Sequence, residues 1–165
     1  MTGHLTLAEA ASAAAAAEDH AHRLGTPIAI TVVDPGGHVI LQHRQDGIHV
    51  AATAVSAAKA RAAALFNRPS GELETFVANP ERPALSALTA VVDDVLAVQG
   101  ALPIRIHLPG HTRPTLLGAV GISGGTPAED EDIARHSANA RPLCENSARC
   151  PIPPRDARTG HHRRP

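Results

Sequence analysis

The stretch IAITVVDPGGHVILQHR, residues 28–44, decides the fold. Ile28 to Val33 is short and rich in β-branched residues, which is typical of a strand. Asp34-Pro35-Gly36-Gly37 places proline and glycine at turn-forming positions, and His38 to Arg44 then reads as the returning strand. The sequence therefore predicts a β-hairpin, in which Val39, Leu41 and His43 share one face while His38, Ile40, Gln42 and Arg44 share the other.

Helices are predicted on both sides of this hairpin. Residues 5–24 form an Ala-rich run in which Thr6 and Glu9 are spaced as in a capping box, and Gly25 follows the run. A second helix is expected over residues 48–66 and a short one over residues 70–77. Apolar side chains repeat at helical spacing in the second helix, and the predicted buried stripe is Ile48, Ala51, Val55, Ala58, Ala62 and Leu65.

The second half of the chain predicts three strands and one helix. Residues 91–98 fit either a helix or a strand, and a strand over residues 94–98 is the preferred interpretation because Gly100 and Pro103 follow at once. Residues 104–106 start another strand, and residues 116–123 return after a turn. The last helix has Thr126 as its N-cap, Pro127 at its first position and Glu129 at its third, and it is expected to fade near Asn139.

This order of elements predicts an α+β fold. Hairpins dominate and no regular βαβ alternation is present, so we expect one layered domain over residues 1–140, with a mainly antiparallel sheet of about five strands packed by helices. From Arg141 onward the composition shifts to proline, arginine and polar residues, which predicts a disordered tail over residues 141–165. Cys144 and Cys150 lie in this tail, and a disulfide between them would constrain nothing in the core.

The composition argues against several classes of function. Aromatic residues make up only 1% of the chain, so the stacking platforms that bind single-stranded nucleic acids are missing, and the net charge is −1. No apolar run approaches the ~20 residues of a membrane span. The N-terminal residues also lack the pattern of a signal peptide. We therefore expect a cytoplasmic protein that has neither a nucleic acid nor a membrane as its partner.

Four stretches resemble the GlcG/HbpS family, which includes the C-terminal domain of PduO-type proteins. The resemblance covers about residues 5–138, and the most specific stretch is GAVGISGGTPAEDEDIA at residues 118–134. The other stretches are residues 5–40, Arg44-Gln45-Asp46-Gly47, and Ser56-Ala57-Ala58-Lys59-Ala60 with Arg68-Pro69-Ser70 after it. The resemblance implies a profilin-like layered fold, assembly into homo-oligomers and, in some members, haem binding. Other members are associated with glycolate or diol metabolism without an assigned reaction.

The resemblance makes histidines the first candidates for a haem site. The chain has eleven histidines, and a neutral imidazole nitrogen can bind haem iron. His43 and His49 lie nearest the Arg44-Gln45-Asp46-Gly47 corner, where Arg44 is placed to meet a propionate. His20 is the competing iron ligand if two subunits share the site. For any single one of these histidines, a surface position or a structural hydrogen bond is the more usual role in proteins.

A second function stays open, that of a cofactor-free enzyme acting on a small carbonyl or carboxylate metabolite. Lys59, Arg44 and Asp46 would then supply proton transfer or charge stabilisation. Arg44 and Asp46 could instead form a strand-end salt bridge with no ligand. Ser123-Gly124-Gly125 resembles an anion cradle, but four acidic residues follow it and favour a tight turn with close packing instead. The sequence thus predicts either a haem-associated or small-ligand-binding homo-oligomer, or such an enzyme.

Overall fold

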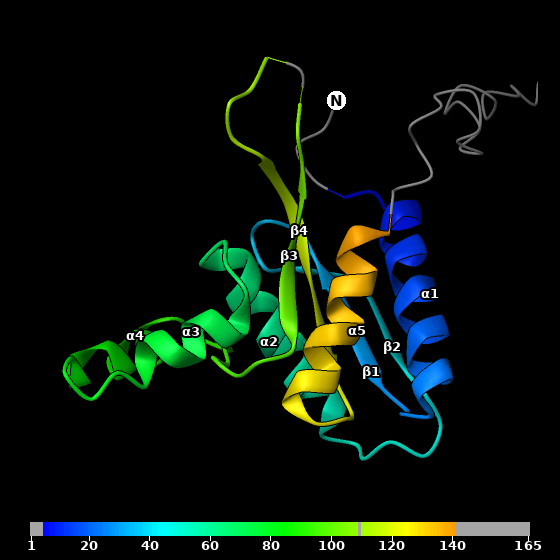
Figure 1. The fold of residues 1–165 in the computed structure, drawn as a ribbon, viewed down its shortest axis with the longest axis horizontal. Coiled ribbons are helices and arrows are strands. Elements are labelled where there is room, and N and C mark those ends of the chain that lie inside the picture. Colours follow the sequence, from blue (N-terminus) through cyan, green and yellow to red (C-terminus); the bar gives the residue numbers. More distant parts are fainter. Residues whose placement is uncertain (1–4, 109, 141–165) are drawn as a thin grey trace, which may run out of the picture.

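The computed structural model describes residues 5–108 and 110–140 and shows helices packed on both faces of one sheet (Figure 1). The predicted tail over residues 141–165, with both cysteines, lies outside the described residues. The α-helices are α1 (Leu7–Leu24), α2 (Ala52–Leu65), α3 (Ser70–Val77), α4 (Leu88–Val91) and α5 (Pro127–Asn139), and a 3-10 helix spans Pro83–Ala87. The strands are β1 (Ala29–Val33), β2 (Val39–Arg44), β3 (Ala101–Ile106) and β4 (Thr115–Ser123).

The sheet is antiparallel throughout, with the strand order β2-β1-β4-β3. It consists of two hairpins, β1–β2 and β3–β4, that the β1–β4 ladder joins. The predicted α+β fold with an antiparallel sheet is confirmed, but the sheet has four strands rather than about five. The prediction of a strand over residues 94–98 is wrong, because this segment lies against a helix: the backbone N–H of Leu96 donates to the carbonyl of Ala58 in α2.

The helices α1 and α5 cover one face of the sheet side by side (Figure 1). Both begin with the predicted capping box: the backbone N–H of Glu9 donates to the Thr6 hydroxyl, and that of Glu129 donates to the Thr126 hydroxyl. Gly25 ends α1 with φ 69°, a left-handed conformation that favours glycine. The predicted bounds of both helices therefore agree with those of α1 and α5 to within a few residues.

The larger core lies between α1, α5 and the sheet. Its bulky side chains come from the strands and from α5, while α1 contributes mainly alanines, so this helix can approach the sheet closely. The Ser137 hydroxyl of α5 donates to the carbonyl of Ala13 in α1 at 2.7 Å, at a buried position. This bond ties the two helices together. The fully buried aliphatic side chains here include Ile28, Ile30, Val32, Val120, Ile122 and Ile133.

On the opposite face, α2 packs on the sheet almost backbone to backbone. A Cβ added to Gly121 of β4 would lie 2.2 Å from the Ser56 carbonyl oxygen, so only glycine permits this approach. The predicted buried stripe is wrong for most of its members: Ala51 and Leu65 are exposed, Ile48, Val55 and Ala58 are half-buried, and of the six only Ala62 is buried. In a helix this rich in alanine the apolar spacing gives little contrast between faces, and polar contacts decide which face is buried. The residues of α2 that are buried are Ala52, Ser56, Lys59, Ala60, Ala62, Ala63 and Ala64.

The helices α3 and α4 project to one side of the sheet (Figure 1). The Ser70 hydroxyl at the start of α3 accepts a hydrogen bond from the backbone N–H of Ala101 at 2.8 Å, which fixes this arm to β3. Within residues 5–108 and 110–140, no helix is both long enough and apolar enough to cross a bilayer.

Candidate functional site

The residues predicted around Arg44 do not gather at one site. His43 of β2 contacts α1, with its Nδ1 2.8 Å from the Glu18 carboxylate. Its neighbour Gln42 donates to the Thr53 carbonyl beside α2, on the other side of the sheet. Because alternate residues of a strand point to opposite faces, Arg44 lies on the α2 side, away from His43. His49 is exposed in the loop before α2.

The Arg44-Gln45-Asp46-Gly47 corner is fixed by its glutamine. The Gln45 side-chain oxygen accepts from the Ile28 backbone N–H at 2.9 Å, and the Gln45 backbone N–H donates to the Ile28 carbonyl. Between these described residues no ion pair joins Arg44 to Asp46. Asp46 is exposed and lines a hollow of about 290 Å³ between the corner and the end of α1, together with Gln45 and His22.

Lys59 is enclosed rather than presented to a pocket. Its Nζ donates to Asp130 Oδ2 at 2.8 Å and to the Ile122 carbonyl at 3.2 Å, and both side chains of the ion pair are 4% exposed. The other Asp130 oxygen accepts from the Gly125 N–H. Burial raises the pKa of Asp130, against the opposing effect of the Lys59 ammonium. A Cβ at Gly100 would lie 2.7 Å from Nζ, so the pair is closed on this side as well.

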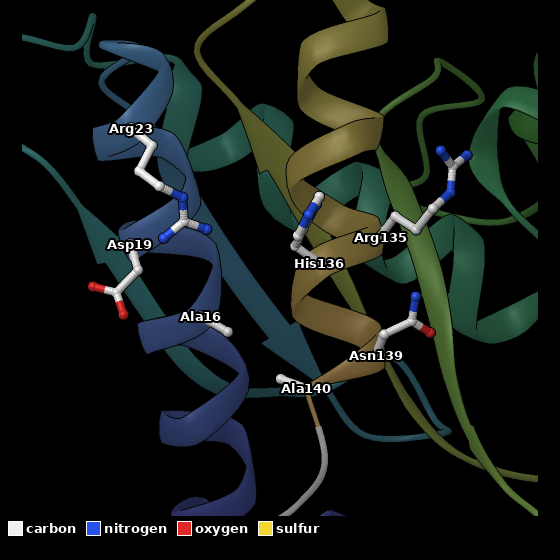
Figure 2. A pocket seen from close by; sticks show the side chains of 7 residues that line it. All are labelled: Ala16, Asp19, Arg23, Arg135, His136, Asn139 and Ala140. Carbon is white, nitrogen blue, oxygen red and sulfur yellow. The ribbon is translucent and has the colours of Figure 1, made fainter.

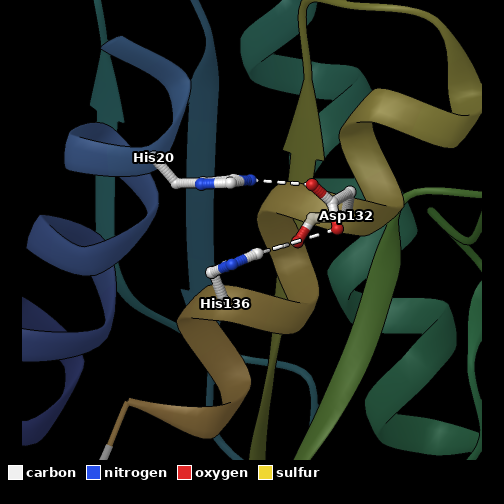
Figure 3. Close-up of side chains that lie close together, drawn as sticks. All are labelled: His20, Asp132 and His136. Carbon is white, nitrogen blue, oxygen red and sulfur yellow. Dashed lines mark hydrogen bonds and ion pairs between the residues drawn. The ribbon is translucent and has the colours of Figure 1, made fainter. Parts of the chain in front are cut away.

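His20 lies in a cluster with two side chains of α5 (Figure 3). Its Nε2 is 2.7 Å from Asp132 Oδ2, and its side chain is 12% exposed. Its ring stacks on the ring of His136, with centroids 3.5 Å apart and an interplanar angle of 18°. Asp132 and His136 are four residues apart on α5, so they share one face of that helix. The fold thus brings one histidine of α1 against an aspartate and a histidine of α5.

The hydrogen bonds of the cluster define which ring nitrogens carry protons. The Arg23 guanidinium, which only donates, lies 3.2 Å from His20 Nδ1, so this nitrogen accepts and Nε2–H donates to Asp132. This bond from His20 holds the pKa of Asp132 below its usual range. His136 Nδ1 lies 2.9 Å from the Asp132 carbonyl oxygen, which only accepts. The ring therefore donates through Nδ1, and a neutral His136 keeps a lone pair on Nε2.

A pocket of about 480 Å³ adjoins this cluster at the seam between α1 and α5 (Figure 2). The Arg23 guanidinium is directed across the seam towards α5, whereas the Arg135 side chain extends away and pairs with Glu131. Ala16 of α1 and Ala140 after α5 are small, so they leave space between the polar side chains of the pocket. Its lining residues are Ala16, Asp19, Arg23, Arg135, His136, Asn139 and Ala140.

Two members of this cluster were absent from the sequence-based candidates. Asp132 was interpreted only as one of the acidic residues near the start of the last helix, and His136 was not singled out. A signal for them does exist in the sequence, since a carboxylate and a histidine four residues apart lie on one face of a predicted helix. Their proximity to His20 has no local signal, because it depends on how α1 and α5 pack.

Comparison with known proteins gives consistent matches. An uncharacterised 15.0 kDa protein of Citrobacter freundii is 29% identical over 130 residues, 79% of this chain and 87% of the relative. The crystal structure of a double mutant of HbpS from Streptomyces reticuli is similar with a TM-score of 0.70 and 29% identity, covering 84% of this chain and 87% of that one. The crystal structure of a PduOC:heme complex has a TM-score of 0.72 and 25% identity, covering 84% and 95%. Residues 5–139 match the family described as haem degrading protein HbpS-like, and the chain belongs to this family.

Proposed function

We propose that this protein binds haem, or a small anionic ligand in its place, at the seam between α1 and α5. Two findings on relatives support this proposal: the family description names haem degradation, and PduOC was crystallised with haem. Among the histidines predicted as iron ligands, His20 is the one that lies beside both a second histidine and a pocket. His43 and His49 remain candidates that the experiment below compares with it.

The residues at the seam fit the polar requirements of haem. The iron needs an unprotonated nitrogen, which a neutral His136 offers at Nε2, and the propionates need a cation, which Arg23 offers. Ala16 and Ala140 leave space between the helices, and about 480 Å³ lies within the roughly 300–1,000 Å³ of ligand pockets. Bound haem would supply an iron centre whose reactivity its axial ligand and surroundings tune.

One observation carries the proposal: His136, oriented by the Asp132 carbonyl, lines the same pocket as Arg23. The cofactor-free enzyme has weaker support. Lys59 is enclosed with Asp130, and Arg44 and Asp46 are exposed without forming a pair. A catalytic group must come within hydrogen-bond reach of its substrate, which the buried Lys59 does not do in this conformation.

Haem titration of purified protein, followed by the Soret absorption, tests the site. We expect His20→Ala and His136→Ala to weaken haem binding about tenfold or more, as is usual when a ligand or its support is removed. His43→Ala is the matched control, because His43 also lies on the α1 side and also contacts a carboxylate. Unchanged affinity in the first two variants would reject the seam, and a loss in His43→Ala or His49→Ala would return the site to the predicted corner.

We also propose that the protein assembles as a homo-oligomer through the side of the sheet that carries α2. Val39 is 55% exposed and lines a hollow of about 410 Å³ with alanines of α2. Five alanines of α1 are already buried in the chain's own core, so this helix offers a partner less small-residue surface than its composition suggests. Light scattering at micromolar concentration should show an oligomer that Val39→Glu dissociates; a monomeric wild type would refute the proposal.

A further inference from the structure

We infer that His20, Asp132 and His136 form a binding site for a divalent first-row transition-metal ion of the zinc or cobalt kind. This inference does not depend on haem, since it concerns the ligand chemistry of the three side chains alone. It goes beyond the proposed function in assigning a free metal ion, with no porphyrin, to the seam between α1 and α5.

The donor set and its spacing suit such an ion. Two imidazoles and one carboxylate are typical ligands of zinc and its neighbours. The donor atoms all lie within 4.8 Å of one another. Ligands at about 2.0–2.2 Å from a tetrahedral ion are about 3.3–3.6 Å apart. His20 Nε2 is 2.7 Å from Asp132 Oδ2, and His136 Nδ1 is 3.8 Å from Asp132 Oδ1. For His136 Nδ1 to bind the ion, the ring proton moves to Nε2 and the bond from Nδ1 to the Asp132 carbonyl is given up. The two stacked imidazole rings must also rotate so that both nitrogens face the ion.

The backbone holds these donors in place before any ion arrives. Asp132 and His136 sit one turn apart on a single helix, and His20 is brought to them by the packing of α1 on α5. The buried bond from Ser137 to the Ala13 carbonyl fixes the two helices beside the cluster. A site assembled on two locked helices loses little conformational freedom when it binds a ligand.

The charges around the cluster also matter for a cation. The carboxylate of Asp132 is stabilised in its ionised form, and Asp19 adds a second carboxylate at the rim of the adjoining pocket. Arg23 opposes these groups, because it donates to His20 Nδ1 and so keeps the proton of that ring on Nε2. For an ion to bind at His20 Nε2, the ring proton must move to Nδ1. The protonated Nδ1 then displaces the Arg23 guanidinium, and the number of protons on the protein does not change.

Three protein ligands leave at least one position for a further ligand. The pocket of about 480 Å³ beside His136 gives this position access to solvent. Three protein ligands with an open fourth place are the arrangement of catalytic rather than structural zinc sites. We therefore assign water or a small carboxylate as the fourth ligand, with the freed Arg23 as the group that would pair with a carboxylate.

Isothermal titration with Zn²⁺ on the haem-free full chain tests the site. Because thiolates also bind zinc, the titrations use a background in which Cys144 and Cys150 are serines. We expect Asp132→Asn and His136→Ala each to weaken zinc binding about tenfold or more, while His43→Ala leaves it unchanged. All three positions are at least partly exposed, so the folded state should survive, and matching thermal melts verify this.

Arg23→Ala supplies a second readout that a merely structural cluster would not give. Removing the guanidinium frees His20 Nδ1, so zinc should bind at least severalfold more tightly; a weaker binding would contradict the tautomer step. Equal zinc affinity in wild type, Asp132→Asn and His136→Ala would overturn the site itself. Haem titrations of the same variants separate the two ideas, because zinc binding without haem binding leaves this inference standing and removes only the proposed function.

Discussion

The two faces of the sheet are held by different kinds of contact. On the α1/α5 face the interior is aliphatic, and the polar side chains His20, Asp132 and His136 lie at the outer seam, where Asp132 and His136 are 44% and 48% exposed. On the α2 face the core consists of small residues, and the polar contacts point inward. There, Lys59 of α2 reaches Asp130 in the first turn of α5, and the hydroxyls of Thr31 and Ser56 bond to each other at 2.8 Å, all of them buried.

This difference indicates which substitutions should affect folding and which should affect ligand binding. A buried polar group that loses its partner costs much more free energy than an exposed one, because water cannot replace the lost bond. Substitutions on the α2 face should therefore act on folding, whereas substitutions at the α1/α5 seam should act on ligands and leave folding almost unchanged. The predictions below test this contrast, beginning with the largest expected effect.

Lys59→Met should lower the free energy of unfolding by about 3–5 kcal/mol at neutral pH, because Asp130 is left buried without its cation. Urea denaturation measures this change. Burial raises the pKa of Asp130 in the folded state, so folding favours the protonated carboxyl. In the variant, the stability that this gives is fully present below the unfolded pKa of Asp130 and is lost as the pH rises through its folded pKa. The deficit should accordingly shrink in acid, and Asp130→Asn added to the variant should recover part of it. A deficit below about 1 kcal/mol would show that water reaches this pair.

Gly121→Ala should cost about 1–3 kcal/mol, because the added methyl group would overlap the backbone of α2. Gly36→Ala is the matched control, since its Cβ would meet only the side chains of His38 and Asp34 in the exposed turn. That variant should stay within about 0.5 kcal/mol of wild type. Thermal unfolding of both proteins measures the difference. Similar melting temperatures for the two variants would mean that α2 can shift away from β4 without cost.

Ser56→Ala and Ser137→Ala compare one serine from each face. Ser56→Ala removes a partner of the buried Thr31 hydroxyl and should cost about 1–3 kcal/mol. Ser137→Ala removes only a second donor from the Ala13 carbonyl, which α1 already engages as a helical acceptor, so about 0.5–1.5 kcal/mol is expected. Denaturant unfolding of the two variants side by side measures both losses. The reverse order would contradict the contrast between the faces.

The smallest expected effect concerns how the free energy of unfolding falls at acidic pH. The bond from His20 lowers the pKa of Asp132 in the folded state, so its stabilisation is present above the ordinary value of about 3.9 and is lost as pH falls through the folded pKa. Because Asp132 is nearly half exposed, the contribution should stay below about 1 kcal/mol. Asp132→Asn should therefore unfold with a slightly weaker pH dependence below pH 4, and an unchanged acid transition would show that the bond contributes nothing.

The sequence was informative wherever a few neighbouring residues determine the structure. The capping boxes at Thr6 and Thr126 and the Asp34–Gly37 turn each work within four residues, so the helix starts and the first hairpin were predicted well. The predicted face of Val39 is wrong, because a register shift between Val32 and Val33 places it with α2 and not with His43. The buried face of α2 was not, because its orientation depends on Thr31, Gly121 and Asp130 from distant elements. Residues 94–98 were misread for a related reason, since their hydrogen-bond partner is a helix far away in the sequence.

The candidate site follows the same rule. His20 was predicted as an iron-ligand candidate through the family resemblance, while His43, Arg44 and His49 were chosen because they are close in sequence to one corner. Neighbours along a strand point to opposite faces, which is why the structure separates His43 from Arg44. The partners of His20 come from the other end of the domain, so only the packing of α1 on α5 reveals Asp132 and His136.

The β1–β4 ladder has a consequence for how fast the protein folds. The two hairpins form from local contacts, but the ladder between them and the packing of α1 on α5 both join opposite ends of the chain. Closing contacts of large sequence separation costs loop entropy before they stabilise the fold, so this topology should fold more slowly than a domain built from local contacts. A ligand that binds only the completed seam would leave the refolding rate almost unchanged and act by slowing unfolding, which makes bound protein long-lived rather than quick to mature.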